Sequence, residues 1–282
     1  MKKIYYITAV FATLFLVGCG DGIDLPGVNV ETDLNKIPLP DNNVNLEQVE
    51  LKPSTEPMLH EGLHTEEDFQ RIRDKKAAGE EPWVSAYQLL VESQFSQKTA
   101  DTYPTEWIKR GISGDENYMN AARGATIVYQ QALRWKIEQD DEYAAKAVEN
   151  LNKWVQTCVG VTGNTNLSLA AGLYGYEFAI AGELLRDYGG WDRADFAAFQ
   201  NWLLKVFYPA NDDFLKRHHD TNALHYWANW CLCNIAAKMA IGIVTDRRDI
   251  YNEGIAHLQT GDTNGRLRRA IYHDYAPEIG RA

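Results

Sequence analysis

The sequence predicts an all-α protein. From Leu63 onward, apolar residues recur at the three- and four-residue spacing of amphipathic helices, and no segment shows the alternation of a convincing strand. Short turns containing Gly, Asp or Pro separate the helical segments. With 282 residues, 45% of them hydrophobic and 24% charged, the chain can bury a large core. A folded, globular helical protein is therefore expected.

The first helix is expected to start after Thr65, a good N-cap residue, because the acidic run 66–68 suits the positive end of a helix dipole. Gly79 ends this helix and Pro82 begins the next. Further helices are predicted at 116–138, 141–159, 167–188, 192–207, 222–244 and 247–258. Successive helical hairpins indicate either a superhelix or a closed (α/α) toroid, and the lack of a strict repeat favours a toroid over residues 59–282.

The N-terminus has the pattern of an export signal. Lys2 and Lys3 precede an apolar run over 4–17 that is short for a membrane span, and Leu-Val-Gly-Cys at 16–19 resembles a bacterial lipobox. The resemblance implies a signal peptide at 1–18, a lipid on Cys19 and attachment of an exported protein to a bacterial membrane. An ordinary secretory signal is the alternative. Residues 19–58, rich in Asp, Asn, Pro and Val, are expected to form a tether.

The remaining cysteines are Cys158, Cys231 and Cys233, an odd number that does not build a disulfide framework. Buried thiols are the interpretation that their surroundings favour. The histidines lack an i, i+4 pair with a third ligand, so the sequence indicates no metal site. No cofactor is expected.

The stretch RHHDTNALHYWANWC at 217–231 combines imidazoles, amides and two tryptophans. If the helix begins at Asn222, then Asn222, His225 and Asn229 share one face. Because the helix becomes almost wholly apolar after Cys231, these polar turns either satisfy one another as a capped helix end or line a cleft. His218 and His219, beside Lys216 and Arg217, are expected in a solvated loop.

A second polar cluster, NGRLRRAIYHDYAPEIGRA, occupies residues 264–282. It places three arginines before two tyrosines: Arg266, Arg268 and Arg269 before Tyr272 and Tyr275. Such a run is often a solvated helix end. In a chain with a net charge of -11, however, local positive charge would attract anions.

Four segments carry a resemblance to a known family: HEGLHTEEDFQRIRDKKAAGEEPW (60–83), NTNLSLAAGLYGYEFAIAGELLRDY (164–188), HYWANWCLCNIAAKMAIGI (225–243) and NGRLRRAIYHDY (264–275). In their order and spacing they resemble the alginate lyase superfamily of toroid polysaccharide lyases. The resemblance implies cleavage of a 4-linked uronic acid polymer by β-elimination, with the polysaccharide as partner and no nucleic acid. It also implies further helices beyond Ala282, which would make this chain a truncated toroid.

β-Elimination requires neutralisation of the sugar carboxylate while a base removes the C5 proton. The resemblance implies that Asn166 and His225 hold the carboxylate, or that His225 is the base for one C5 epimer. Arg266 would pair with the carboxylate and stabilise the phenolate of Tyr272, which would take the C5 proton or protonate the leaving O4.

Substrate-binding roles are expected for Asn222, Trp227, Asn229, Trp230 and Tyr275. Each has a structural alternative. Asn166 and Asn222 suit helix N-caps, Asn229 a buried amide, and the tryptophans a core. Tyr275 follows Arg269 at the spacing by which Tyr272 follows Arg266, so it is the alternative tyrosine.

Two other functions remain open at this point. A helical glycan-binding lipoprotein would share the tether and the tryptophans but release no product. A toroid glycoside hydrolase would need two carboxylates flanking the bond. Five aspartates are candidates for that pair: Asp187, Asp192, Asp212, Asp213 and Asp220.

Overall fold

The computed structural model describes residue 60 and residues 62–271. The predicted signal peptide (1–18), the tether (19–58) and Cys19 lie outside these residues. The described helices are α3 (Glu66–Ala77), α4 (Trp83–Glu92), α5 (Tyr118–Glu138), α6 (Asp141–Thr157), α7 (Leu167–Leu184), α8 (Arg193–Val206), α9 (Tyr208–Arg217), α10 (Ala228–Val244), α11 (Arg248–Thr260) and α12 (Leu267–Ile271). The all-α prediction is confirmed.

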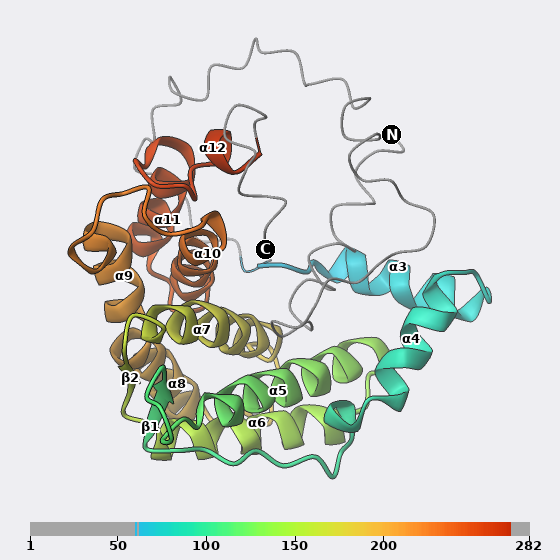
Figure 1. Ribbon diagram of the computed structural model, residues 1–282. Helices are drawn as coiled ribbons and strands as arrows, with labels where there is room; N and C mark the ends of the chain where they lie inside the picture. The colour runs from blue at the N-terminus through green and yellow to red at the C-terminus, as the bar shows by residue number, and fades with distance from the viewer. Residues whose placement is uncertain (1–59, 61, 272–282) are drawn as a thin grey trace. The chain divides into compact units, whose positions relative to one another are not determined.

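α7 is the central helix of this arrangement, because it packs against α5 on one side and α10 on the other (Figure 1). α6 packs on α5, α11 packs on α10, and α8 contacts both α6 and α9. Helices of an inner row thus alternate along the chain with helices that cover them. This is the succession of helical hairpins that the sequence predicts.

Small residues let α7 approach α10 closely. A Cβ atom at Gly172 would lie 2.5 Å from Cys233 Sγ, so only glycine fits at this crossing. The rest of α7 is largely buried, and Phe178 at its centre contacts the rings of Trp154, Trp202 and Phe207 at centroid distances of 5.4, 5.2 and 6.1 Å. These aromatic contacts join α6, α7 and α8 into the main core.

The N-cap prediction for the first helix is confirmed. Thr65 Oγ1 accepts a hydrogen bond from Asp68 N, and the Asp68 carboxylate accepts one in return from Thr65 N, which completes a capping box. Pro82 directly precedes α4, as predicted. All three described cysteines, Cys158, Cys231 and Cys233, are free thiols and buried, which confirms that interpretation.

Three features of the fold differ from the sequence prediction, and the first is α9, which forms over residues that no predicted helix covers. A pair of short parallel strands, β1 (Trp107–Arg110) and β2 (Gly160–Gly163), was not foreseen. The predicted helix 222–244 begins only at Ala228, because α9 and a 3-10 turn, η3 (His218–Asp220), precede an irregular segment over residues 221–227. Within the described residues, no helix has both the length and the apolar character needed to cross a membrane.

Candidate active site

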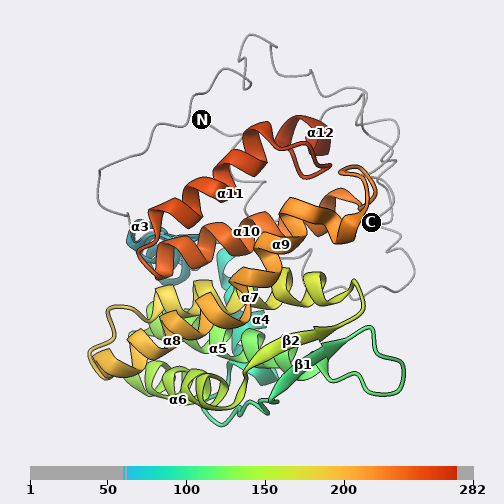
Figure 2. The same cartoon turned by 90° about the vertical axis from the view of Figure 1, so that its left-hand side faces the viewer.

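The two parallel strands end at the same edge, next to the start of α7. Arg110 is paired with Gly163 in the last register position, and each strand runs directly into a loop. Gly111 has a φ of +83°, and a Cβ atom there would lie 1.9 Å from Asn164 Oδ1. The two loops are therefore in contact, and Figure 2 shows this edge close to the N-terminal end of α7.

Asn166 occupies the N-cap position of α7, but its side chain does not cap the helix. Its Nδ2 instead donates to Asn164 Oδ1 at 3.0 Å. The alternative in which the Asn166 amide serves as a capping group is therefore wrong. The side chain is held against the loop and stays partly exposed at the end of the inner helices.

Arg110 is a residue of this site that the sequence did not reveal. Its guanidinium lies 4.7 Å from the centroid of the Tyr118 ring, and its Nη1 is 3.5 Å from the Tyr174 hydroxyl, to which it donates. Within residues 60–271 as described, no carboxylate forms an ion pair with Arg110. A half-buried cation with phenolic neighbours and no described counter-ion is suited to bind a carboxylate.

The pKa of Tyr174 determines whether its phenol can donate or accept a proton in this site. Burial raises the pKa of Tyr174 to about 12, and Arg110 only partly opposes that shift. At neutral pH the phenol therefore remains protonated. Tyr174 can donate a hydrogen bond to an anionic group, but its raised pKa disfavours a role as the base at neutral pH.

A buried polar contact joins the start of α7 to the turn after α9. Ser168 is fully buried, and its Oγ lies 2.9 Å from His219 Nε2. His218 is also buried, and its Nε2 lies 3.9 Å from Cys231 Sγ. The expectation that His218 and His219 lie in a solvated loop is wrong, because the 3-10 turn directs both rings inward. Burial lowers the pKa of His218, which favours a neutral ring.

His225 lies on the irregular segment 221–227, here called the His225 loop. Asn222, His225 and Asn229 do not share a helical face, contrary to the prediction, because α10 starts after His225. Asn222 Oδ1 accepts from Leu224 N at 2.9 Å and so closes a local turn instead of capping α10. The His225 ring is exposed and stands edge-on to Tyr226, at a centroid distance of 4.9 Å.

The aromatic residues around this loop have different surroundings. Trp227 is 39% exposed and therefore accessible to a ligand. Trp230 is partly buried, with its ring 4.7 Å from that of Tyr226 and 5.9 Å from that of Phe214. Asn229 is exposed in the first turn of α10, so the alternative of a buried amide is wrong.

The segment before Arg266 contacts the His225 loop directly. Asn264 Nδ2 donates to the carbonyl oxygens of Leu224 and Tyr226 at 3.0 and 2.8 Å. Arg266 follows two residues later, and its Nε donates to Gln259 O at 3.2 Å. Tyr272 and Tyr275 lie outside the described residues. Contacts thus link three of the four predicted catalytic segments: those of Asn166, His225 and Arg266.

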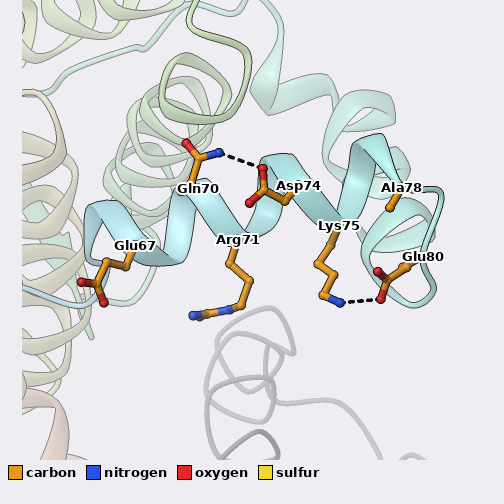
Figure 3. A pocket seen from close by; sticks show the side chains of 7 residues that line it. All are labelled: Glu67, Gln70, Arg71, Asp74, Lys75, Ala78 and Glu80. Atoms are coloured by element: carbon orange, nitrogen blue, oxygen red, sulfur yellow. Dashed lines mark hydrogen bonds and ion pairs between the residues drawn. The ribbon is translucent and has the colours of Figure 1, made fainter.

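The described surface also has a hollow of about 540 Å³ along α3, lined by Glu67, Gln70, Arg71, Asp74, Lys75, Ala78 and Glu80 (Figure 3). Its polar groups are largely engaged with one another, since Lys75 pairs with Glu80 at 2.6 Å and Gln70 donates to Asp74 at 2.8 Å. No predicted site residue lines it. This hollow is therefore a charged surface feature and not the candidate site.

The described residues contain no group of three or more His, Cys, Asp or Glu side chains arranged to hold a metal ion. No curated protein and no solved structure matches the chain. A family model described as alginate lyase matches residues 72–270, which include most of the described helices and every site residue that the structure describes. The chain therefore belongs to the alginate lyase family.

Proposed function

We propose that this protein cleaves a 4-linked uronic acid polymer, of the alginate or polyglucuronate class, by β-elimination. The observation that supports the proposal is that contacts around the first turns of α7 link the segments that bear an amide, a guanidinium and an imidazole. Asn166, Arg110 and the His225 loop are connected there through α7 and its neighbours. These groups can neutralise a sugar carboxylate, so that negative charge can develop on it in the transition state.

In this reaction a base removes the C5 proton, electrons form the C4–C5 double bond, and the C4–O4 bond breaks. The leaving O4 receives a proton. His225, exposed and adjacent to Tyr226, is available either as the base or as a carboxylate ligand. The second proton transfer is assigned to Tyr272 from the sequence, while Tyr174 stays protonated and contributes a hydrogen bond.

The hydrogen bonds and ion pairs of the candidate aspartates favour a lyase over a hydrolase. Asp192 caps α8 by accepting from Ala194 N at 2.7 Å, while Asp213 and Asp220 both pair with Arg217. Lysine partners, Lys216 and Lys238, hold the pKa of Asp212 below its usual value despite partial burial. A hydrolase needs one carboxylic acid with a raised pKa, whereas the pKa values of Asp212 and Asp213 are shifted in the opposite direction.

The direct test is to incubate the protein with mannuronate, guluronate and glucuronate polymers and to follow the absorbance of the conjugated double bond. His225→Ala and Arg110→Met should each reduce turnover by about 100-fold or more, because each removes a group that acts on the carboxylate or on a proton. Circular dichroism should show the helical fold retained. Saturated products, or full activity in both variants, would contradict the proposal.

We also propose that the protein is exported and anchored to a bacterial membrane through lipidated Cys19. This proposal rests on the sequence of residues 1–19. Metabolic labelling with a fatty acid should mark the wild-type protein and not Cys19→Ser, which should appear in the soluble fraction. Equal labelling of both proteins would exclude Cys19 as the attachment site.

A further inference from the structure

The His225 loop has no regular secondary structure, although it carries the imidazole on which the proposed reaction depends. It is largely exposed, and Leu224 is 52% exposed. A loop of this kind moves unless polar contacts hold its backbone. The position of His225 must therefore be set from outside the loop.

Asn264 supplies one such contact. Its side chain is only 9% exposed, and its amide group bonds the carbonyl oxygens on either side of His225, those of Leu224 and Tyr226. A carboxamide NH₂ group has two hydrogens, and both are used here. The backbone on each side of the imidazole is thus fixed by one side chain, which lies two residues before Arg266.

The contact between Ser168 and His219 supplies the second. It links the turn before the loop to the first turn of α7, two residues after Asn166. His218, His219 and Asp220 adopt φ values of 49°, 53° and 60°, a left-handed run that non-glycine residues rarely adopt. Such backbone persists only where the surroundings hold it. The buried Ser168 hydroxyl is part of those surroundings, and the His219 ring also packs edge-on against Tyr226 at 5.7 Å.

We propose that Asn264 and the Ser168–His219 pair are positioning residues that fix His225 relative to the segments of Asn166 and Arg266. The inference rests on the proposed lyase function. Each contact originates two residues from another member of the predicted catalytic set. A shift at either one moves His225 away from the groups with which it acts on the same sugar ring, without removing any group that touches the substrate.

The test uses Asn264→Asp, which preserves shape but removes both donors, and Ser168→Ala. Asn150→Asp is the matched control, because Asn150 is likewise a buried asparagine whose Nδ2 donates to two acceptors, Ala100 O and Gln131 Oε1, far along the chain from the loop. Measurements on the full chain give kcat and KM, the pH profile of kcat/KM, and the hydrogen exchange of the amides over 221–227.

Both site variants should lower kcat by about 10- to 100-fold while KM changes much less, because misplacement of a reacting group affects mainly the chemical step. They should also speed exchange over 221–227. The double variant should lose less activity than the product of the single losses, since both act on one loop. The Asn150→Asp control should lose stability but keep the kcat, the pH profile and the loop exchange rate of the wild type.

Unchanged exchange over 221–227 in both site variants would overturn the inference, because the contacts would then not hold the loop. Faster exchange with wild-type kcat would also overturn it, because the loop position would not matter for the reaction. A wild-type protein without turnover on any uronate polymer would instead reject the proposed function. In that case unaltered hydrogen exchange over 221–227 in the site variants would also show that Asn264 and Ser168 do not hold the His225 loop.

Discussion

At the scale of single residues, the most informative group outside the site is Glu177, in the middle of α7. Burial raises the pKa of this carboxyl from its ordinary value of 4.5 to about 7. In the unfolded chain the same group ionises at lower pH. As pH rises from about 4.5 to about 7, the unfolded state therefore loses its proton before the folded state does, and the folded state becomes less favoured.

Glu177→Gln should remove this pH-dependent cost. We expect the variant to gain about 3 kcal/mol in free energy of unfolding relative to wild type between pH 4.5 and pH 8. Urea denaturation across that range measures the difference. Glu67→Gln, at an exposed position on α3, is the control and should show no such trend. A constant difference between Glu177→Gln and wild type at all pH values would show that the fold does not raise the pKa of Glu177.

Residue identities alone suggested candidate site residues but not their geometry. Asn166, His225 and Arg266 were identified from their segments, and contacts link those segments. Arg110, Ser168, His219 and Asn264 were not singled out for the site. Their roles come from partners distant in the chain, as with Ser168 and His219, whose sequence separation is 51. No local pattern reports a pairing of that kind.

At the scale of secondary structure elements, α10 combines an apolar surface with one buried charge. Lys238 is fully buried and pairs with Asp212 of α9 at 2.9 Å and Glu253 of α11 at 2.6 Å. Tyr208 also donates to the Glu253 carboxylate at 3.2 Å. One ammonium group therefore holds three successive helices together in this part of the fold.

Lys238→Ala should lower the free energy of unfolding by about 3 to 5 kcal/mol, because it leaves partly buried carboxylates without their shared partner. Denaturant titration measures this loss. The control is Lys205→Ala on α8, where the lysine is exposed and the cost should stay below about 0.5 kcal/mol. Equal stability of the two variants would mean that the ion pairs contribute nothing net.

Helix boundaries were predictable where they depend on local chemistry. Thr65 and Pro82 marked the starts of α3 and α4, because capping and proline geometry act within one turn. The start of α10 was placed at residue 222 because its sequence is compatible with a helix. In the folded chain, contacts from Ser168 and Asn264 instead hold residues 218–227 in turns. β1 and β2 were missed because each is four residues long and pairs with a segment about 50 residues away.

At the scale of the whole molecule, two clusters of buried apolar side chains stabilise different parts of the described chain. The main core surrounds Phe178, while a smaller cluster around Phe214 and Tyr226 lies under the candidate site. α10 belongs to both, since Ile241 lies in the main core and Ile235 in the smaller cluster. The site end is therefore supported separately from the rest of the core.

Phe178→Ala should lower the free energy of unfolding by about 3 to 5 kcal/mol, since it opens a cavity among three aromatic rings. Against a typical total of about 5 to 15 kcal/mol, this is a large loss. Thermal and urea denaturation measure it. Leu89→Ala, at a side chain that is 71% exposed, is the control and should be nearly neutral. A small effect of Phe178→Ala would show that the main core is not packed around this ring.

The sequence by itself determined that this protein is helical, which segments form most of its helices, and which family it belongs to. Those properties follow from spacing, capping residues and short motifs, all of which act locally along the chain. Only the tertiary structure decided where α10 begins, that two short strands place Arg110 beside α7, and that Asn264 and Ser168 brace the loop carrying His225. The physical reason is that these features depend on hydrogen bonds and close packing between residues that are remote in sequence and adjacent only after folding.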